Sequence, residues 1–184
     1  MATLFSTITA DPPWHMAGGG TSVRGAQKHY NLLKTPDIPG VIRGSGLFNP
    51  AENAHLYLWT TNNYLPDGLW VMEQLGFRYV SNIVWTKNAY GIGHYFRGQH
   101  ELCLFGVRGK GLDVCTLRHD IPSVIRAPRR AHSQKPDCFY RLVEARSKGP
   151  FLELFARNTR PGWVSWGHGV PPIKAKGSTN LGEP

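Results

Sequence analysis

The chain has 184 residues, of which 41% are hydrophobic and 18% are charged, a composition ordinary for one globular domain with a proper core. No apolar run approaches the ~18 residues of a membrane-spanning helix. Three cysteines without a Cys-x-x-Cys pair argue against a disulfide framework, so we expect a protein of the reducing cytoplasm. The formal charge of +9 at pH 7 predicts a polyanionic partner, although basic charge also occurs in proteins that touch no nucleic acid.

The first predicted element is a buried strand over residues 4–10, in which Leu4, Phe5 and Ile8 lie among β-branched threonines. Pro12 and Pro13 end it, so the strand delivers the Asp11 carboxylate and the Trp14 indole to the rim of a sheet. The Asp11 carboxylate and the Pro12 carbonyl could each accept a hydrogen bond from an exocyclic amino group of a nucleobase, and Trp14 could stack on the base. The alternative is that Asp-Pro-Pro-Trp is only a turn that closes the strand.

Further along the chain, short apolar runs alternate with segments of helical periodicity. Strands are predicted at residues 55–60, 79–85, 99–107, 151–155 and 163–166, with a further one at 123–125, and helices at 36–43, 65–75 and from 135–137 to 148–150. Strand, helix and strand at such short intervals predict a right-handed βαβ unit and a largely parallel sheet. We expect residues 1–170 to form a single domain and residues 171–184, which are rich in Pro, Gly, Lys and Ser, to form a loose tail.

Positive charge gathers between residues 107 and 133, where the periodic pattern loosens. The basic residues are Arg108, Lys110, Arg118, Arg126, Arg129 and Arg130. A charge run is often only a solvated face. Because this one follows a strand of the predicted parallel sheet, we expect it to reach over the same rim as Asp11 and to contact phosphates, with Arg129 and Arg130 as substrate contacts.

Several separated blocks, taken in order, resemble the MT-A70 family of adenine-N6 methyltransferases, from residue 8 to residue 168. The blocks are Asp-Pro-Pro-Trp at 11–14, His-Tyr at 29–30, Trp-Thr-Lys-Asn at 85–88, Gly-His-Tyr-Phe-Arg at 93–97, His-Glu-Leu-Cys-Leu at 100–104, Ser-Gln-Lys-Pro-Asp at 133–137 and Glu-Leu-Phe-Ala-Arg at 153–157. The resemblance implies an α/β, Rossmann-like methyltransferase fold with helices on both faces of a mostly parallel sheet. It also implies a permuted order, with the catalytic strand ahead of the cofactor strand.

The resemblance further implies S-adenosylmethionine as the methyl donor and the N6 amino group of adenine as the acceptor. The implied catalytic residues are Asp11, Pro12, Pro13 and Trp14. The implied cofactor-binding residues are Asp11, Lys135, Phe155, Arg157, Thr159 and His168, where Thr159 and His168 depart from the family pattern. The implied substrate-binding residues are Tyr30, Trp85, Lys87, Glu101, Arg129 and Arg130. Asp11 is expected to act as a hydrogen-bond acceptor rather than as a strong general base.

Three function classes stay open at this point. The first is methylation of DNA adenine, with RNA as the close alternative, in a bacterial or phage-infected cell and with a possible homodimer or heterodimer partner. The second is a catalytically silent, nucleic-acid-binding subunit, which the intact Asp-Pro-Pro-Trp disfavours. The third is a small-molecule methyltransferase, which the basic charge disfavours. No metal is expected, because His100 and Cys103 lie at an odd offset on a predicted strand and so on opposite faces. Trp85 is read either as a base platform or as a core residue.

Overall fold

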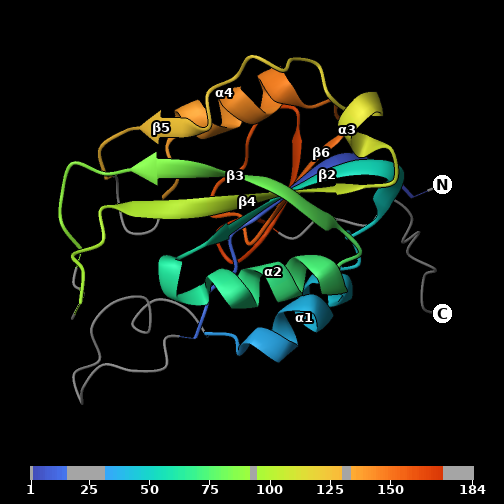
Figure 1. Ribbon diagram of the computed structural model, residues 1–184. Helices are drawn as coiled ribbons and strands as arrows, with labels where there is room; N and C mark the ends of the chain where they lie inside the picture. The colour runs from blue at the N-terminus through green and yellow to red at the C-terminus, as the bar shows by residue number, and fades with distance from the viewer. Residues whose placement is uncertain (1, 16–31, 92–94, 130–133, 172–184) are drawn as a thin grey trace, which may run out of the picture.

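The structure is a computed structural model that describes residues 2–15, 32–91, 95–129 and 134–171. Its described residues form one seven-stranded sheet with helices on both faces (Figure 1). The strands are β1 (Phe5–Ala10), β2 (Pro50–Thr60), β3 (Arg78–Thr86), β4 (His100–Arg108), β5 (Val124–Arg126), β6 (Phe151–Leu154) and β7 (Trp163–Trp166). Within the described ranges, no helix is both long enough and apolar enough to cross a membrane.

The strand order in the sheet is β5-β3-β4-β2-β1-β6-β7. Every neighbouring pair is parallel except the two pairs that include β4, which is antiparallel to both β2 and β3. The predicted mostly parallel α/β sheet is therefore confirmed. The predicted βαβ unit of β2 and β3 is modified, because β4 lies between the two strands instead of leaving them paired.

Helices cover both faces of this sheet. They are the 3₁₀ turns η2 (Thr35–Asp37) and η3 (Asn62–Tyr64) and the helices α1 (Ile38–Gly44), α2 (Leu65–Gln74), α3 (Gly111–Val114) and α4 (Asp137–Arg146). In Figure 1, α1 and α2 lie on one face, and α3 and α4 lie on the other. The alternating residues of β2 enter both halves of the core. Leu56 and Leu58 pack with α1 and α2, whereas Tyr57 and Trp59 pack with α4, which explains the continuous apolar run.

The structure differs from the predicted elements at several places. β2 begins at Pro50, five residues earlier than expected, and its extension pairs partly with β1. The short helix α3 was not predicted. Lys135 precedes α4 instead of lying in its first turn, because the helix begins at Asp137. Residues 172–184 of the expected tail lie outside the described part of the chain.

Candidate active site

Asp11 follows β1 directly, at the edge of the sheet where the parallel strands have their carboxyl ends. β1 pairs with β6 in register, with Ala10 opposite Leu154, so the turn after β6 stands beside Asp11. Phe155 opens that turn with a φ of 62°, a left-handed conformation that is uncommon outside glycine. Ligands of open α/β sheets bind beyond the carboxyl ends of the strands. The first strand of the chain and a strand near its end therefore meet at one site.

Glycine at position 167 is what lets the turn after β6 pack closely. The Ala156 N–H donates a hydrogen bond of 2.8 Å to the Trp166 carbonyl at the end of β7. A Cβ on Gly167 would lie 2.2 Å from the Ala156 carbonyl oxygen, which is far inside contact distance. The turn after β6 is thus held against the chain that leaves β7. This packing fixes the positions of Phe155 and Arg157, which belong to the turn.

A chain of alternating charges joins Asp11 to Lys135, Glu101 and Lys87. The Nζ atom of Lys135 lies 2.9 Å from Oδ1 of Asp11 and 3.2 Å from Oε2 of Glu101, and only 7% of the Lys135 side chain is exposed. Lys87 donates a hydrogen bond to the other oxygen of Glu101. Two ammonium groups also lie over tryptophan rings, Lys135 over Trp59 at 4.8 Å and Lys87 over Trp85 at 4.7 Å. Asp11 is therefore fixed through one of its two carboxylate oxygens, and Lys87 is engaged inside the protein.

The buried position of this charge chain changes the pKa values of its inner members. Burial alone would raise the pKa of the Glu101 carboxyl, but the Lys135 ammonium and the hydrogen bond from Lys87 hold it below its ordinary value. Burial alone would lower the pKa of Lys135, yet Asp11 and Glu101 raise it above its ordinary value. Both groups are consequently charged at neutral pH, and the ammonium group of Lys135 lies against Asp11.

Trp14 is more enclosed than a simple base platform. It is 8% exposed, its Nε1–H donates to the Trp59 carbonyl at 3.0 Å, and its ring stacks on Tyr64 with centroids 5.7 Å apart. The Trp14 backbone N–H donates to the Pro12 carbonyl at 2.9 Å. One face of the indole and one lone pair of that carbonyl are thus occupied. The indole locks the Asp-Pro-Pro-Trp turn against β2, and the Pro12 oxygen keeps its second lone pair.

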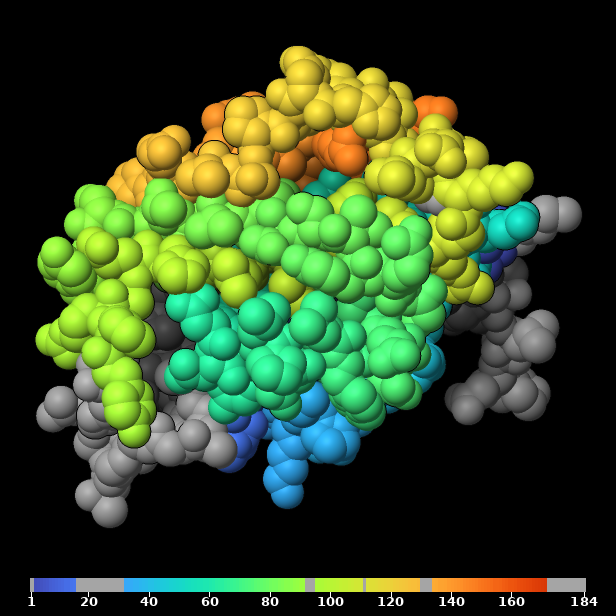
Figure 2. All heavy atoms as spheres, viewed as in Figure 1, coloured from blue at the N-terminus to red at the C-terminus, as the bar shows by residue number. Residues whose placement is uncertain are grey.

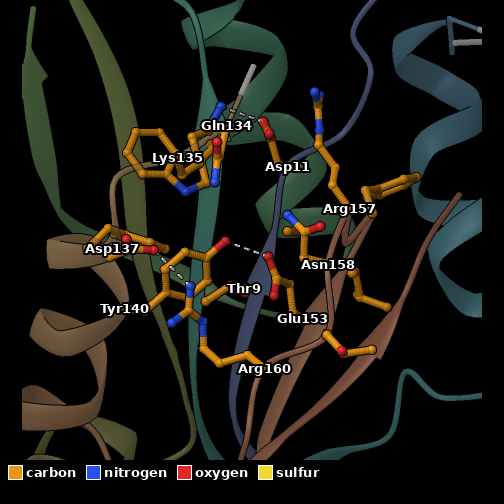
Figure 3. Close-up of a pocket in the computed structure, with 16 residues that line it drawn as sticks. Thr9, Asp11, Gln134, Lys135, Asp137, Tyr140, Glu153, Arg157, Asn158 and Arg160 are labelled. Carbon is orange, nitrogen blue, oxygen red and sulfur yellow. Dashed lines mark hydrogen bonds and ion pairs between the residues drawn. The ribbon is translucent and has the colours of Figure 1, made fainter. Parts of the chain in front are cut away.

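A cavity opens beside Asp11 between β1, β6, the start of α4 and the turn after β6 (Figure 3). Its lining residues are Thr9, Ala10, Asp11, Trp59, Gln134, Lys135, Asp137, Phe139, Tyr140, Glu153, Leu154, Phe155, Arg157, Asn158, Thr159 and Arg160. Five of the six predicted cofactor residues are among them. His168 is exposed and does not line the cavity.

The floor of the cavity carries a polar cluster that the sequence reading missed. The Tyr140 hydroxyl donates a hydrogen bond of 2.6 Å to Oε1 of Glu153, and the Arg160 guanidinium lies 3.7 Å over the Tyr140 ring. Arg160 also donates to Asp137 at 3.3 Å. Burial raises the pKa of Glu153 above its ordinary value, although the hydrogen bond from Tyr140 and the charge of Arg160 oppose the shift. The sequence signal that could have indicated this cluster is Glu153 itself, a carboxylate between Leu152 and Leu154 on a short buried strand.

The cavity residues suit a polar ligand that carries charges of both signs. Carboxylates (Asp11, Glu153) and cations (Lys135, Arg157) share the same walls. Three polar atoms of the lining are buried without a hydrogen-bond partner, Oγ1 of Thr9, Nε1 of Trp59 and Nε of Arg160. Buried polar atoms without partners are rare in folded proteins, and a ligand can supply the missing partners. Within the described residues, no group of three or more His, Cys, Asp or Glu side chains is arranged to hold a metal ion.

Three of the six predicted substrate residues lie together, because Lys87 contacts both the Trp85 ring and Glu101. Glu101 and Lys87 belong to the charge chain, whereas Trp85 is 3% exposed and donates its Nε1–H to the Ala127 carbonyl at 2.9 Å, which favours the core reading. Arg129 is exposed. Tyr30 and Arg130 lie outside the described residues.

The basic segment does not lie on one edge as expected. Because β4 is antiparallel, Arg108 at its end stands opposite Ala54, near the start of β2, and Lys110 follows there, at the far edge from Asp11. Arg126, in contrast, pairs with Thr86 at the end of β3 and so lies at the edge of the site. Arg118 forms an exposed ion pair with Asp120 at 2.7 Å. The segment is thus divided between two edges of the molecule.

Comparison with known proteins places this arrangement in a family. The family model MT-A70 matches residues 5–169. The chain is 30% identical to human "N(6)-adenosine-methyltransferase catalytic subunit METTL3" and 30% identical to the Medicago truncatula "Putative N(6)-adenosine-methyltransferase MT-A70-like", over 92% of this chain but only 29% and 27% of those proteins. It is 27% identical to "Type II methyltransferase M.MunI" of Mycoplasma sp, over 92% of this chain and 79% of that protein. The chain therefore belongs to the MT-A70 family of N6-adenosine methyltransferases.

Proposed function

We propose that this chain transfers the methyl group of S-adenosylmethionine to the N6 amino group of adenine in DNA. The observation that carries the proposal is the placement of Asp11, held by Lys135 at 2.9 Å, on the rim of a polar cavity at the carboxyl edge of the sheet. Family membership supports methyl transfer. The formal charge of +9 supports a polyanionic substrate. The match to a type II methyltransferase over 79% of its length favours DNA, with RNA as the alternative.

In this proposal the cavity holds the methyl donor. Lys135 and Arg157 would face the donor's carboxylate or hydroxyl groups. Glu153 and Asp137 would accept hydrogen bonds from the donor's N–H or O–H groups. Thr9 and Trp59 would gain hydrogen-bond partners for their buried polar atoms. The bound donor supplies an electrophilic methyl group on a cationic sulfur. Asp11 stands between this cavity and the outer rim, so the acceptor nitrogen must approach from the rim.

The protein's part in the reaction is alignment. The lone pair of adenine N6 is delocalised into the ring, and holding both N–H groups directs it toward the methyl carbon. Lys135 binds Oδ1 of Asp11, which leaves Oδ2 to accept one N6 hydrogen, and the second lone pair of the Pro12 carbonyl accepts the other. During the transfer N6 would gain positive charge, which these two acceptors would stabilise, and a proton would leave to water afterwards.

The test is methyl transfer from labelled donor to matched DNA and RNA oligonucleotides that contain adenine. Wild-type protein should label DNA, and Asp11→Ala should lower the rate by roughly 10²–10³ with little change in donor affinity. Asp120→Ala, which removes an exposed carboxylate far from the cavity, is the matched control and should keep full activity. A wild-type protein that labels neither polymer, or an Asp11→Ala protein with normal rate and normal donor binding, would contradict the proposal.

A further inference from the structure

The connection between β3 and β4, described at residues 87–91 and 95–99, lies at the edge of the candidate active site. Its two arms are joined by backbone hydrogen bonds from Lys87 to Gln99 and from Gly91 to Gly98, both 2.7 Å long. A Cβ on Gly91 would lie 2.8 Å from the Gly98 carbonyl oxygen, so the arms approach as closely as backbone allows. In Figure 2, this part of the chain projects from the left of the molecule, the side toward which β3 runs.

The connection presents its aromatic side chains to solvent. Tyr95 is 97% exposed, Phe96 is 90% exposed and Tyr90 is 70% exposed, whereas Tyr79 at the start of β3 is 41% exposed. We call Tyr90, Tyr95 and Phe96 the aromatic tip. Single exposed apolar residues are ordinary, but adjacent aromatic side chains that contact almost nothing mark a surface for a partner. In this exposed position the three aromatic side chains bury little apolar surface, so they contribute little to the stability of the core.

The charge around the aromatic tip selects the kind of partner. From residue 88 to residue 100 the sequence contains Arg97 and no Asp or Glu, whereas Lys87 at the base of the connection is paired with Glu101. Arg126, exposed at the end of β5, lies on the same edge because it pairs with Thr86, the last residue of β3. Flat aromatic rings beside cations, without carboxylates, match a strand that presents stacked bases and phosphates. An acidic phosphate backbone fits this surface better than a second basic copy of the chain does.

The position of the connection relates it to Asp11. Trp85 and Glu101 are paired at its base, and Glu101 is joined through Lys135 to Asp11. The aromatic tip thus stands beyond the same edge from which the acceptor base must approach. An adenine that reaches Asp11 has to leave its base stack, and unstacking costs a few kcal/mol unless the neighbouring bases find other partners.

We propose that Tyr95 and Phe96 stack on the bases next to the target adenine and keep that adenine out of the base stack. The inference rests on the proposed nucleic-acid substrate and deepens it, because it assigns the side chains that contact the flanking nucleotides. Arg97 and Arg126 contact the phosphates on either side of those nucleotides. The aromatic tip contributes affinity and unstacking, while the methyl-transfer geometry stays with Asp11 and Lys135.

The experiment compares the double variant Tyr95→Ala, Phe96→Ala with wild type and with Tyr79→Ala, an aromatic deletion at the opposite end of β3. Affinity is measured by fluorescence anisotropy with mixed-sequence, adenine-containing oligonucleotides, as single-stranded DNA, duplex DNA and single-stranded RNA. Unstacking is measured with 2-aminopurine in place of adenine. Each lost base contact should weaken binding roughly 5- to 150-fold, and the rise in 2-aminopurine fluorescence should disappear. Phe96→Trp in the Tyr95→Ala background should restore part of the affinity and part of the rise in 2-aminopurine fluorescence.

Thermal unfolding and donor affinity of the double variant should equal those of wild type, since the replaced rings are almost fully exposed. If the double variant binds nucleic acid as tightly as wild type, or loses no more affinity than Tyr79→Ala does, the inference is overturned. It is also overturned if the double variant loses self-association in sedimentation while its nucleic-acid binding is unchanged. If wild type transfers methyl groups and the double variant binds equally well, the proposed function stands and this inference fails. If wild type binds nucleic acid through the aromatic tip but transfers no methyl group, the proposed function fails and this inference stands.

Discussion

At the scale of single residues, the site depends on carboxylates that are held in different ways. Asp11 and Glu101 share one buried ammonium group, Lys135, and Glu101 has a second cation in Lys87. Glu153 has a phenol instead, and its cation, Arg160, lies over the Tyr140 ring rather than against the carboxylate. The environments of Glu101 and Glu153 therefore move their pKa values in opposite directions. The two carboxyl groups can be distinguished by how stability responds to pH.

Glu101→Gln should destabilise the protein at neutral pH. The pKa of Glu101 is lowered because its cation partners outweigh its burial, so its contribution is fully present above the unfolded-state value of about 4.3 and is lost as pH falls through the folded value. We expect a loss of about 1–3 kcal/mol at pH 7, as for a hydrogen bond to a charged group. Urea unfolding at pH 7 and at successively lower pH tests this. A difference between wild type and variant that grows as pH falls would contradict the assignment.

Glu153→Gln should have the opposite effect. Burial raises the pKa of Glu153, so the folded state favours the protonated form, and that preference helps stability below the unfolded value and is lost as pH rises through the folded value. Glutamine keeps an oxygen for the Tyr140 hydroxyl but avoids the buried charge. The variant should melt at a higher temperature than wild type near pH 8 and at the same temperature below about pH 4. Thermal unfolding across this range, without donor, is the measurement, and a variant less stable than wild type near pH 8 would count against it.

At the scale of elements, the site is held by contacts between segments rather than by any one strand. The turn after β6 presents Phe155 and Arg157 because the chain leaving β7 packs against it through Gly167. The antiparallel β4 brings Glu101 beside the end of β3 and so beside Lys87. Both arrangements join strands that follow one another in the chain, whereas the meeting of Asp11 with the turn after β6 requires β1 and β6, which are distant in sequence, to be neighbours in the sheet.

Gly167→Ala should disturb this packing. The new Cβ would lie 2.2 Å from the Ala156 carbonyl oxygen, which is backbone and cannot rotate away, so the turn must shift. We expect a loss of about 1–3 kcal/mol of stability, the usual cost of overpacking, together with weaker donor binding by calorimetry. Gly40→Ala in α1, where a Cβ meets nothing within 4 Å, is the matched control and should leave donor affinity unchanged and stability equal or higher, because alanine favours a helix over glycine. Normal donor affinity in Gly167→Ala would separate this turn from the donor site.

At the scale of the whole molecule, the distribution of charge matters more than its sum. The formal charge is +9, but Arg108 and Lys110 stand at the edge away from Asp11, while Arg126, Arg129 and the aromatic tip belong to the part of the surface near the site. Nucleic-acid binding through phosphates should therefore respond to the position of a basic residue and not to net charge alone.

The salt dependence of binding tests this distribution. The slope of log affinity against log salt is about −0.9 per phosphate contact for duplex DNA and about −0.7 for single strands. Arg126→Ala with Arg129→Ala should make the slope shallower by roughly one to two contacts without changing donor affinity. Arg108→Ala with Lys110→Ala removes the same charge at the opposite edge and should leave the slope unchanged. Equal effects of the two pairs would mean that only net charge matters.

The sequence by itself determined the local features: the strand that ends at Asp-Pro-Pro-Trp, the helices at 65–75 and before residue 148, and the family blocks that name Asp11 and Lys135. Periodicity and turn residues report these, because they act over a few neighbouring positions. Only the tertiary structure decided the direction of β4, which moved Arg108 away from the site, and the burial of Trp85 and Trp14. It also decided the pairing of Tyr140 with Glu153 and of Lys135 with two carboxylates, since such contacts depend on sheet order, which local pattern does not encode.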